Sequence, residues 1–117
     1  MENSSNQNQE LTKTFKGEIW MAYDEKSKKT RPFLIVTNAL SGIDIDISVA
    51  PATTKEQRNP YDVSIEFWDN AGLSQPSVVR CSKIHYIAHM LLKRKLGKLD
   101  ERDLIKVNEA IRLYFGL

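Results

Sequence analysis

A short apolar run in the first third of the chain constrains the fold most. Residues 33–37 are all apolar or β-branched, which predicts a buried central strand. Pro32 stands at the expected start of this strand, where a missing backbone N–H is tolerated. A proline restricts the preceding residue to extended conformations, so we expect Arg31 at the rim of the sheet with little backbone freedom. A guanidinium held in this way suits an anion, although many such arginines only face solvent.

The size of the chain predicts a single domain. Its 117 residues suffice for one core but not for two, and residues 1–13 are polar and aperiodic, which predicts a disordered tail before a domain of residues 14–117. There is no apolar run of about 18 residues and no secretory signal pattern, so we expect a cytoplasmic protein without membrane contact. Cys81 is the only cysteine, which fits a reducing compartment.

Alternating patterns predict most of the remaining elements. Residues 18–23 are expected to form a strand with both faces at least partly covered. Apolar residues alternate with polar ones in residues 43–49 and 61–67, and residues 77–84 are expected to form a further strand. Asp100 is the expected N-cap of a C-terminal helix, with Glu101 and Asp103 in its first turn and Gly116 at its end. The sum is a mainly β fold, a strongly bent antiparallel sheet of about five or six strands with a C-terminal α-helix.

Several polar groups are candidates for binding an anion. Thr53 and Thr54 follow an apolar strand, and the loop before Arg31 is rich in lysine. Residues 80–98 contain six basic residues and no acidic one, a pattern that suits a phosphate backbone or simply a solvated surface. The threonines are equally consistent with turn formation.

Metal chemistry and thiol catalysis are not predicted. His85 and His89 are four residues apart, but no third ligand follows in sequence. Asp44 and Asp46 occupy outward positions of a strand, where carboxylates usually serve solubility. No pattern of orienting residues accompanies Cys81. We therefore expect no metal and no cofactor.

The order of short motifs resembles the MazF/PemK family, the toxins of bacterial type II toxin–antitoxin systems. The motifs are Gly17-Glu18-Ile19-Trp20, Thr30-Arg31-Pro32 with Leu34-Ile35-Val36, Val49-Ala50-Pro51-Ala52-Thr53, Gly72-Leu73, Val78-Val79-Arg80-Cys81, Ile84 with Ile87, and Leu96-Gly97-Lys98-Leu99 before a helix that ends in Gly116-Leu117. The resemblance covers residues 17–117. Each motif alone is unspecific, and their common order carries the similarity.

This resemblance implies a compact, SH3-like β-barrel that forms a homodimer. Most members are endoribonucleases that cut single-stranded RNA at short sequences without a metal. The 2′-OH attacks the adjacent phosphate and leaves a 2′,3′-cyclic phosphate and a 5′-OH. A cognate antitoxin is the implied protein partner, with a flexible acidic segment in the RNA groove, and operator DNA is bound only through the antitoxin.

The resemblance also implies roles for individual residues. Arg31 matches the family's catalytic arginine, Thr53 its catalytic threonine or serine, and Arg80 the arginine of the PemK-type motif. The residues expected to contact RNA are Thr54, Lys28, Lys29, Gln57, Ser82 and His85. PemK members carry an acidic residue where this chain has Ser82, and the loop before Arg31 is short and lacks the histidine of some members. The resemblance therefore leaves the proton donor and acceptor unassigned.

Two alternatives remain open from the sequence. A toxin of the same fold binds DNA gyrase through an aromatic-Gly-aliphatic tail, and this chain ends in Phe115-Gly116-Leu117. The other alternative is a degenerate member that only binds antitoxin, which the serine at position 82 suggests.

Overall fold

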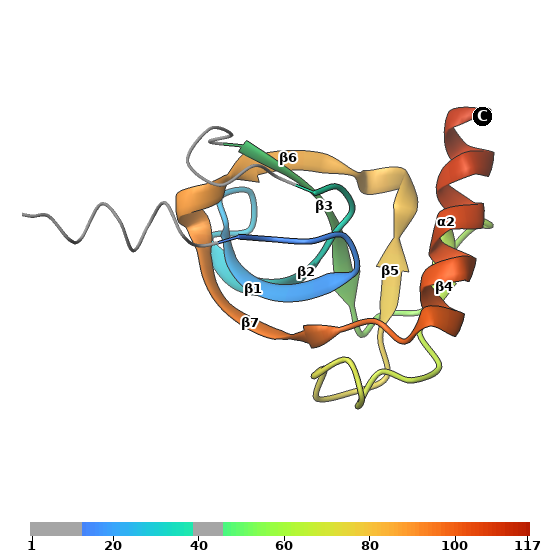
Figure 1. The fold of residues 1–117 in the computed structure, drawn as a ribbon, viewed down its shortest axis with the longest axis horizontal. Coiled ribbons are helices and arrows are strands. Elements are labelled where there is room, and N and C mark those ends of the chain that lie inside the picture. The colour runs from blue at the N-terminus through green and yellow to red at the C-terminus, as the bar shows by residue number, and fades with distance from the viewer. Residues whose placement is uncertain (1–12, 39–45) are drawn as a thin grey trace, which may run out of the picture.

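The computed structural model describes residues 13–38 and 46–117, and within them the chain forms one antiparallel sheet and a C-terminal helix (Figure 1). The elements are β1 (Glu18–Asp24), β2 (Lys29–Ile35), β3 (Asp46–Thr53), β4 (Asp62–Ser64), β5 (Val78–Arg80), β6 (His85–Ala88), β7 (Leu92–Lys98), the 3₁₀ helices η1 (Cys81–Lys83) and η2 (His89–Leu91), and α2 (Glu101–Phe115). The predicted tail, except for Lys13, and the start of the strand predicted at residues 43–49 lie outside these ranges.

The spatial order of the strands is β4-β5-β3-β2-β1-β7, with β6 also paired to β3. The prediction of a mainly antiparallel sheet with a C-terminal helix is confirmed. The expectation of a barrel is wrong in one respect, because no described ladder joins β7 to β4 or β6 and the sheet is not closed. Strand β4 spans 3 residues and lies beside α2 rather than beside β7, so the helix covers the end of the sheet that a barrel would join (Figure 1).

The central strand β3 changes partners along its length. Its residues pair with β2 from Val49 to Pro51, the last pair being Phe33 with Pro51. Beyond that point, Ala52 and Thr53 pair only with β5. The first part of β2 pairs only with β1, so the two central strands separate immediately after Phe33 and Pro51. We call this point the strand fork.

Side-chain alternation divides the core between the two faces of the sheet. On one face, a buried cluster joins Ile19 and Leu34 to Val107 of α2. On the other, a second cluster contains Ala22 and Phe33. We call these the helix face and the opposite face, and the register of each strand assigns its side chains to one of them.

Several element boundaries differ from the predictions. Strand β2 already begins at Lys29, so Pro32 lies inside it; this is tolerated because that part of β2 has no partner on the β3 side. The strand predicted at residues 61–67 is only β4, and the strand predicted at residues 77–84 stops at Arg80, where η1 begins. Strands β6 and β7 were not predicted. In β7, exposed lysine and arginine side chains, which are common on edge strands, hide the alternation of apolar and polar residues.

The C-terminal helix confirms its predicted caps. The Asp100 carboxylate accepts a hydrogen bond from the Arg102 N–H at 2.9 Å, and Gly116 ends the helix with φ 73°. Asp103 does more than place charge in the first turn. It is fully buried, and its two oxygens accept hydrogen bonds from the N–H groups of Glu66 at 3.0 Å and Phe67 at 2.9 Å. The carboxylate thus fastens the turn after β4 to the helix.

We expect Asp103→Ala to lower the free energy of unfolding by about 2–3 kcal/mol, because two backbone donors lose a charged acceptor. Glu101→Ala is the matched control, since Glu101 lies in the same helical turn but is exposed. Urea denaturation of both variants measures the difference. Equal effects would show that only the charge in the first turn matters.

No helix of the described residues is both long and apolar enough to cross a membrane.

Candidate active site

Arg31 and Thr53 lie on either side of the strand fork and share a face of the sheet. Phe33 pairs with Pro51 at the end of the β2–β3 ladder. If the same antiparallel register is extended by two residues in each strand, Arg31 corresponds to Thr53, and the two side chains belong to the same face of the sheet. Arg31 pairs with Ala22 on β1, a member of the cluster on the opposite face. The side chains of Arg31 and Thr53 therefore both belong to the opposite face, at its rim, where the two backbones no longer hydrogen-bond to each other.

The β1–β2 turn fixes the Arg31 side chain from one side. Its Nε donates a hydrogen bond to Ser27 Oγ at 2.9 Å, and Ser27 Oγ donates to Asp24 Oδ2 at 2.8 Å. Arg31 Nε also lies 3.7 Å from Asp24 Oδ2. The side chain is still 42% exposed, so the guanidinium is oriented without being removed from solvent. This arrangement suits a phosphate ligand.

The two predicted threonines, Thr53 and Thr54, lie on different faces of the sheet. Thr53 ends β3, half-buried, with its Oγ1 accepting a hydrogen bond from the Lys55 N–H at 3.2 Å. Thr54 is the next residue, is exposed, and lines a pocket that also contains Pro32. Thr53 therefore shares a face of the sheet with Arg31, whereas Thr54 lines the pocket.

His85 joins the same face as Arg31 and Thr53. It pairs with Val49 in the β3–β6 ladder, and its ring packs edge-on against Phe33, with 5.9 Å between centroids. His85 Nδ1 lies 2.9 Å from the carbonyl oxygen of Lys83. A carbonyl can only accept, so Nδ1 carries a proton, and in the neutral ring Nε2 is the free acceptor. His85 is exposed on this face of the sheet.

Arg80 differs from its predicted setting. The basic stretch of residues 80–98 suggested a phosphate-binding or solvated surface, but Arg80, the last residue of β5, is only 8% exposed and does not contribute to one. Its Nη1 pairs with the fully buried Asp62, and its Nη2 donates to the carbonyl oxygen of Glu56 at 3.4 Å. Strand register explains the pairing, because Asp62 lies directly opposite Arg80 on β4. A guanidinium buried in this way needs a counter-charge.

Asp62 is the residue of this region that the sequence analysis missed. The alternating pattern placed it outward, whereas its side chain is fully buried. Its Oδ2 also accepts a hydrogen bond from the Arg58 N–H at 2.8 Å, and its Oδ1 has no hydrogen-bond partner among the described residues. An arginine in an otherwise apolar strand was the available signal, because such an arginine requires an acid nearby.

The other predicted RNA contacts are spread over three places. Lys28 and Lys29 are exposed at the β1–β2 turn and the start of β2, close in sequence to Arg31. Gln57 is exposed and accepts a hydrogen bond from Ser64 Oγ at 3.2 Å. Ser82 is half-buried in η1. Only the two lysines extend the site of Arg31 and Thr53.

The basic stretch of residues 80–98 does not form one surface. Arg80 is buried, and Lys95 Nζ lies 3.1 Å from Glu18 Oε2. Burial alone would raise the pKa of Glu18, but hydrogen bonds from Trp20, Phe15 and Lys95 lower it, which keeps the carboxylate charged beside Lys95. Of the exposed cations that remain from this stretch, Lys83 lies in η1, and Lys93, Arg94 and Lys98 lie on β7.

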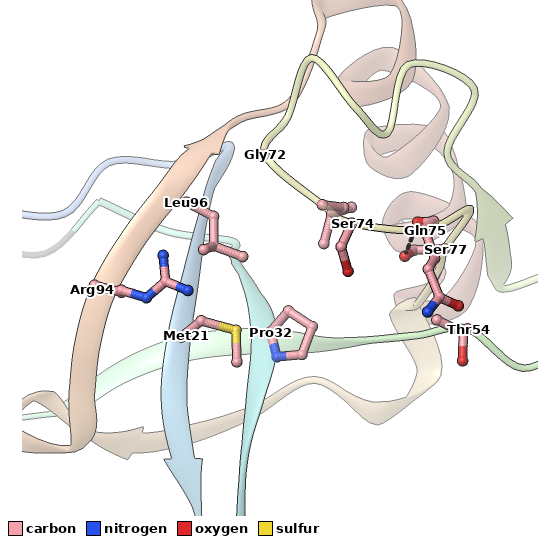
Figure 2. A pocket seen from close by; sticks show the side chains of 10 residues that line it. Met21, Pro32, Thr54, Gly72, Ser74, Gln75, Ser77, Arg94 and Leu96 are labelled. Carbon is pink, nitrogen blue, oxygen red and sulfur yellow. Dashed lines mark hydrogen bonds between the residues drawn. The ribbon is translucent and has the colours of Figure 1, made fainter.

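A pocket of about 280 Å³ lies on the helix face beside the strand fork (Figure 2). Its apolar lining comes from β1, β2 and β7 and includes Met21, Pro32 and Leu96. Its polar lining comes from Thr54, Arg94 and the loop before β5, with Ser74, Gln75 and Ser77. Ser77 Oγ donates a hydrogen bond to the Gln75 carbonyl oxygen at 2.8 Å, which holds this loop in a turn.

Two glycines let the loop lie directly on β7. A Cβ at Gly72 would stand 2.2 Å from the carbonyl oxygen of Leu96, and one at Gly97 would stand 2.4 Å from that of Ala71. Gly72 also has φ +88°, which disfavours other residues. The pocket wall thus depends on close backbone contact at Gly72 and Gly97.

We expect Gly72→Ala to destabilise the protein more than Gly116→Ala. Both glycines have positive φ, so each alanine costs about 1–2 kcal/mol of backbone strain. Only Gly72 also faces a backbone atom, and this overlap adds about 1–3 kcal/mol; nothing lies within 4 Å of a Cβ at Gly116. Thermal unfolding of the two variants measures the difference, and similar melting temperatures would contradict the packing argument.

The described residues contain neither a cluster of metal-binding side chains nor an activated thiol. No group of three or more His, Cys, Asp and Glu side chains there is arranged to hold a metal ion. Burial, and to a smaller extent the charge of Asp62, raises the pKa of Cys81 to about 11, so its thiol stays protonated at neutral pH.

Comparison with known proteins points to one family. A family model described as "PemK-like, MazF-like toxin of type II toxin-antitoxin system" matches residues 15–115. The Mycobacterium tuberculosis toxin MazF-mt6 superimposes with a TM-score of 0.74 at 32% identity, covering 86% of this chain and 97% of that one. A mycobacterial endoribonuclease in complex with its cognate antitoxin gives a TM-score of 0.73 at 22% identity, covering 89% of this chain and 96% of that one.

A curated protein agrees with the structural matches. The probable endoribonuclease MazF of Mycolicibacterium smegmatis is 27% identical over 90 residues, which cover 76% of this chain and 83% of that protein. Because the family model spans nearly all of the described residues, the chain belongs to the PemK-like, MazF-like toxins of type II toxin–antitoxin systems.

Proposed function

We propose that this protein is a metal-independent endoribonuclease that cleaves single-stranded RNA at short sequences, and that Arg31 and Thr53 bind the scissile phosphate. The argument that carries the proposal is that the β2–β3 register, extended past the pair of Phe33 with Pro51, puts Arg31 and Thr53 on one face at the strand fork. The Arg31 guanidinium is exposed there and is oriented by the β1–β2 turn. Membership of the toxin family, and the name endoribonuclease on its relatives, support the reaction class.

The proposed reaction is an internal transesterification. The ribose 2′-OH attacks the adjacent phosphorus while the bond to the 5′-oxygen of the next nucleotide breaks, which yields a 2′,3′-cyclic phosphate and a 5′-OH. The Arg31 guanidinium and the Thr53 hydroxyl donate hydrogen bonds to the phosphorane oxygens, where negative charge develops. Lys28 and Lys29 attract the neighbouring phosphates.

We assign the proton transfer to His85. Its exposed Nε2 is an acceptor on the same face as Arg31 and Thr53, and the Lys83 carbonyl fixes the ring tautomer. As a base, Nε2 takes the proton of the 2′-OH; as an acid, it returns a proton to the leaving 5′-oxygen. Arg80 remains a proposed contributor to catalysis, and Ser82 a proposed RNA contact outside the site of Arg31 and Thr53. Arg80, held by Asp62, acts from within the sheet by fixing the strand end that carries Thr53.

The test is digestion of a long single-stranded RNA by the purified protein in EDTA, with mapping of the new ends. We expect cuts at a short recurring sequence, with cyclic phosphate and 5′-hydroxyl ends. Intact RNA would overturn the proposal. Cleavage that requires an added divalent cation would overturn the metal-independent chemistry.

We also propose a homodimer and a cognate antitoxin as partners, with operator DNA bound only through the antitoxin. The complex of a mycobacterial relative with its antitoxin supports the second partner. Exposed apolar side chains on β6, η2 and α2, including Tyr86, Met90 and Leu113, provide surface for protein contacts. Light scattering of the pure protein tests the dimer.

The gyrase-binding alternative would be favoured by a different result. In that case the protein leaves RNA intact and traps gyrase–DNA complexes, and deleting residues 116–117 abolishes the trapping.

A further inference from the structure

We propose that the pocket on the helix face binds one unstacked base of the RNA, next to the scissile phosphate, and thereby sets the cleavage sequence. This inference rests on the proposed ribonuclease function and deepens it. No part of the pocket is needed for the chemistry at Arg31 and Thr53, so the two proposals can be tested separately.

The position of the pocket links it to the phosphate site. Pro32 and Thr54, which line it, are the direct sequence neighbours of Arg31 and Thr53. Arg31 and Pro32 are neighbours within β2 and point to opposite faces, while Thr54 directly follows the end of β3 and lines the pocket. The phosphate site and the pocket therefore lie on opposite faces of the sheet at the strand fork. A strand of RNA that passes the fork can place a phosphate on one face and turn the adjacent base to the other.

The lining of the pocket fits a nucleobase. Met21, Pro32 and Leu96 form an apolar wall for the flat face of a base, and Figure 2 shows Ser74 and Gln75 across from them. The Gln75 amide and the hydroxyls of Ser74 and Thr54 offer both donors and acceptors, as reading a base edge requires. The volume of about 280 Å³ is near the lower end of ligand pockets, enough for one base and too small for a folded element.

The charge of the lining favours RNA over a cation or a basic peptide. Arg94 is exposed on β7, and within the described chain it forms no ion pair with any carboxylate. The lining residues include no aspartate or glutamate. A guanidinium at the edge of such a pocket can stack on a base or contact the next phosphate.

The experiment compares cleavage profiles on an RNA pool with randomised sequence. Arg94→Ala removes the cation, and Ser74→Phe fills the pocket from an exposed loop position. Lys93→Ala is the matched control for Arg94, because Lys93 is the adjacent exposed cation of β7 and does not line the pocket. Asn70→Phe is the control for Ser74, since Asn70 is exposed in the preceding turn and outside the lining.

We expect the two pocket variants to lower kcat/KM at the preferred sequence by about 10- to 100-fold and to flatten the preference for one base beside the cut. The two controls retain the wild-type profile, and melting temperatures verify that all four variants fold. Arg31→Ala, by contrast, lowers cleavage at every sequence alike.

The possible outcomes separate the two proposals. If wild-type protein cuts RNA and the pocket variants keep its base preference, the pocket inference fails and the nuclease function stands. If these variants instead lose only the inhibition by antitoxin, the pocket belongs to the protein partner and the inference also fails. If wild-type protein does not cut RNA, the proposed function fails. Binding of a 2′-O-methyl RNA, which cannot be cleaved, then tests the pocket alone, and equal affinity of wild type and Ser74→Phe would overturn it.

Discussion

Replacing Arg31 by alanine is expected to slow the cleavage of single-stranded RNA by about 100- to 1,000-fold, which is the usual cost of losing one donor to a developing oxyanion. The loss should appear in kcat more than in KM, because the extra negative charge exists only in the transition state. Single-turnover cleavage of a short fluorescent RNA measures it. The fold should survive, since the side chain is 42% exposed and contributes no core contact.

Two further variants make this prediction specific. Arg31→Lys keeps the charge but loses the planar fork and the Nε bond to Ser27, so it should recover only part of the rate. Lys26→Ala removes an exposed cation of the same turn and should cut almost as fast as wild type. If Arg31→Ala retains the wild-type rate, or if Lys26→Ala loses as much, Arg31 does not bind the scissile phosphate.

The second large effect is expected in stability. Asp62→Leu should lower the free energy of unfolding by about 3–5 kcal/mol, because it leaves the buried Arg80 guanidinium without its counter-charge. The Arg58 N–H also loses its acceptor. Urea unfolding measures the loss, and Asp69→Ala, an exposed carboxylate of the next turn, is the control with little expected change.

A double variant identifies the cause. Adding Arg80→Met to Asp62→Leu removes the unpaired charge, so we expect most of the lost stability to return. If the double variant is as unstable as Asp62→Leu, the loss comes from packing around residue 62. The rate at which the double variant cleaves RNA should be measured as well. If the folded double variant cuts at the wild-type rate, Arg80 does not contribute to catalysis.

Local sequence patterns were enough to predict much of the fold and part of the site. The run after Pro32 predicted a buried central strand, and Leu34 and Ile35 are indeed fully buried. The caps at Asp100 and Gly116 located the helix correctly. Arg31 was identified because it matches the family's catalytic arginine, and the restriction that Pro32 places on its backbone agrees with that role. Strand β7 was missed because its exposed basic side chains hide the alternation.

By itself, then, the sequence determined the family, the mainly antiparallel sheet, the terminal helix and the candidate residues Arg31 and Thr53. Only the tertiary structure decided which side chains meet. The register of β2 and β3 puts Thr53 on the same face of the sheet as Arg31, Thr54 lines the pocket, and the β4–β5 register buries Arg80 against Asp62. The physical reason is that strand pairing joins residues far apart in sequence, and shifting a register by one residue would exchange the faces of every side chain in the strand.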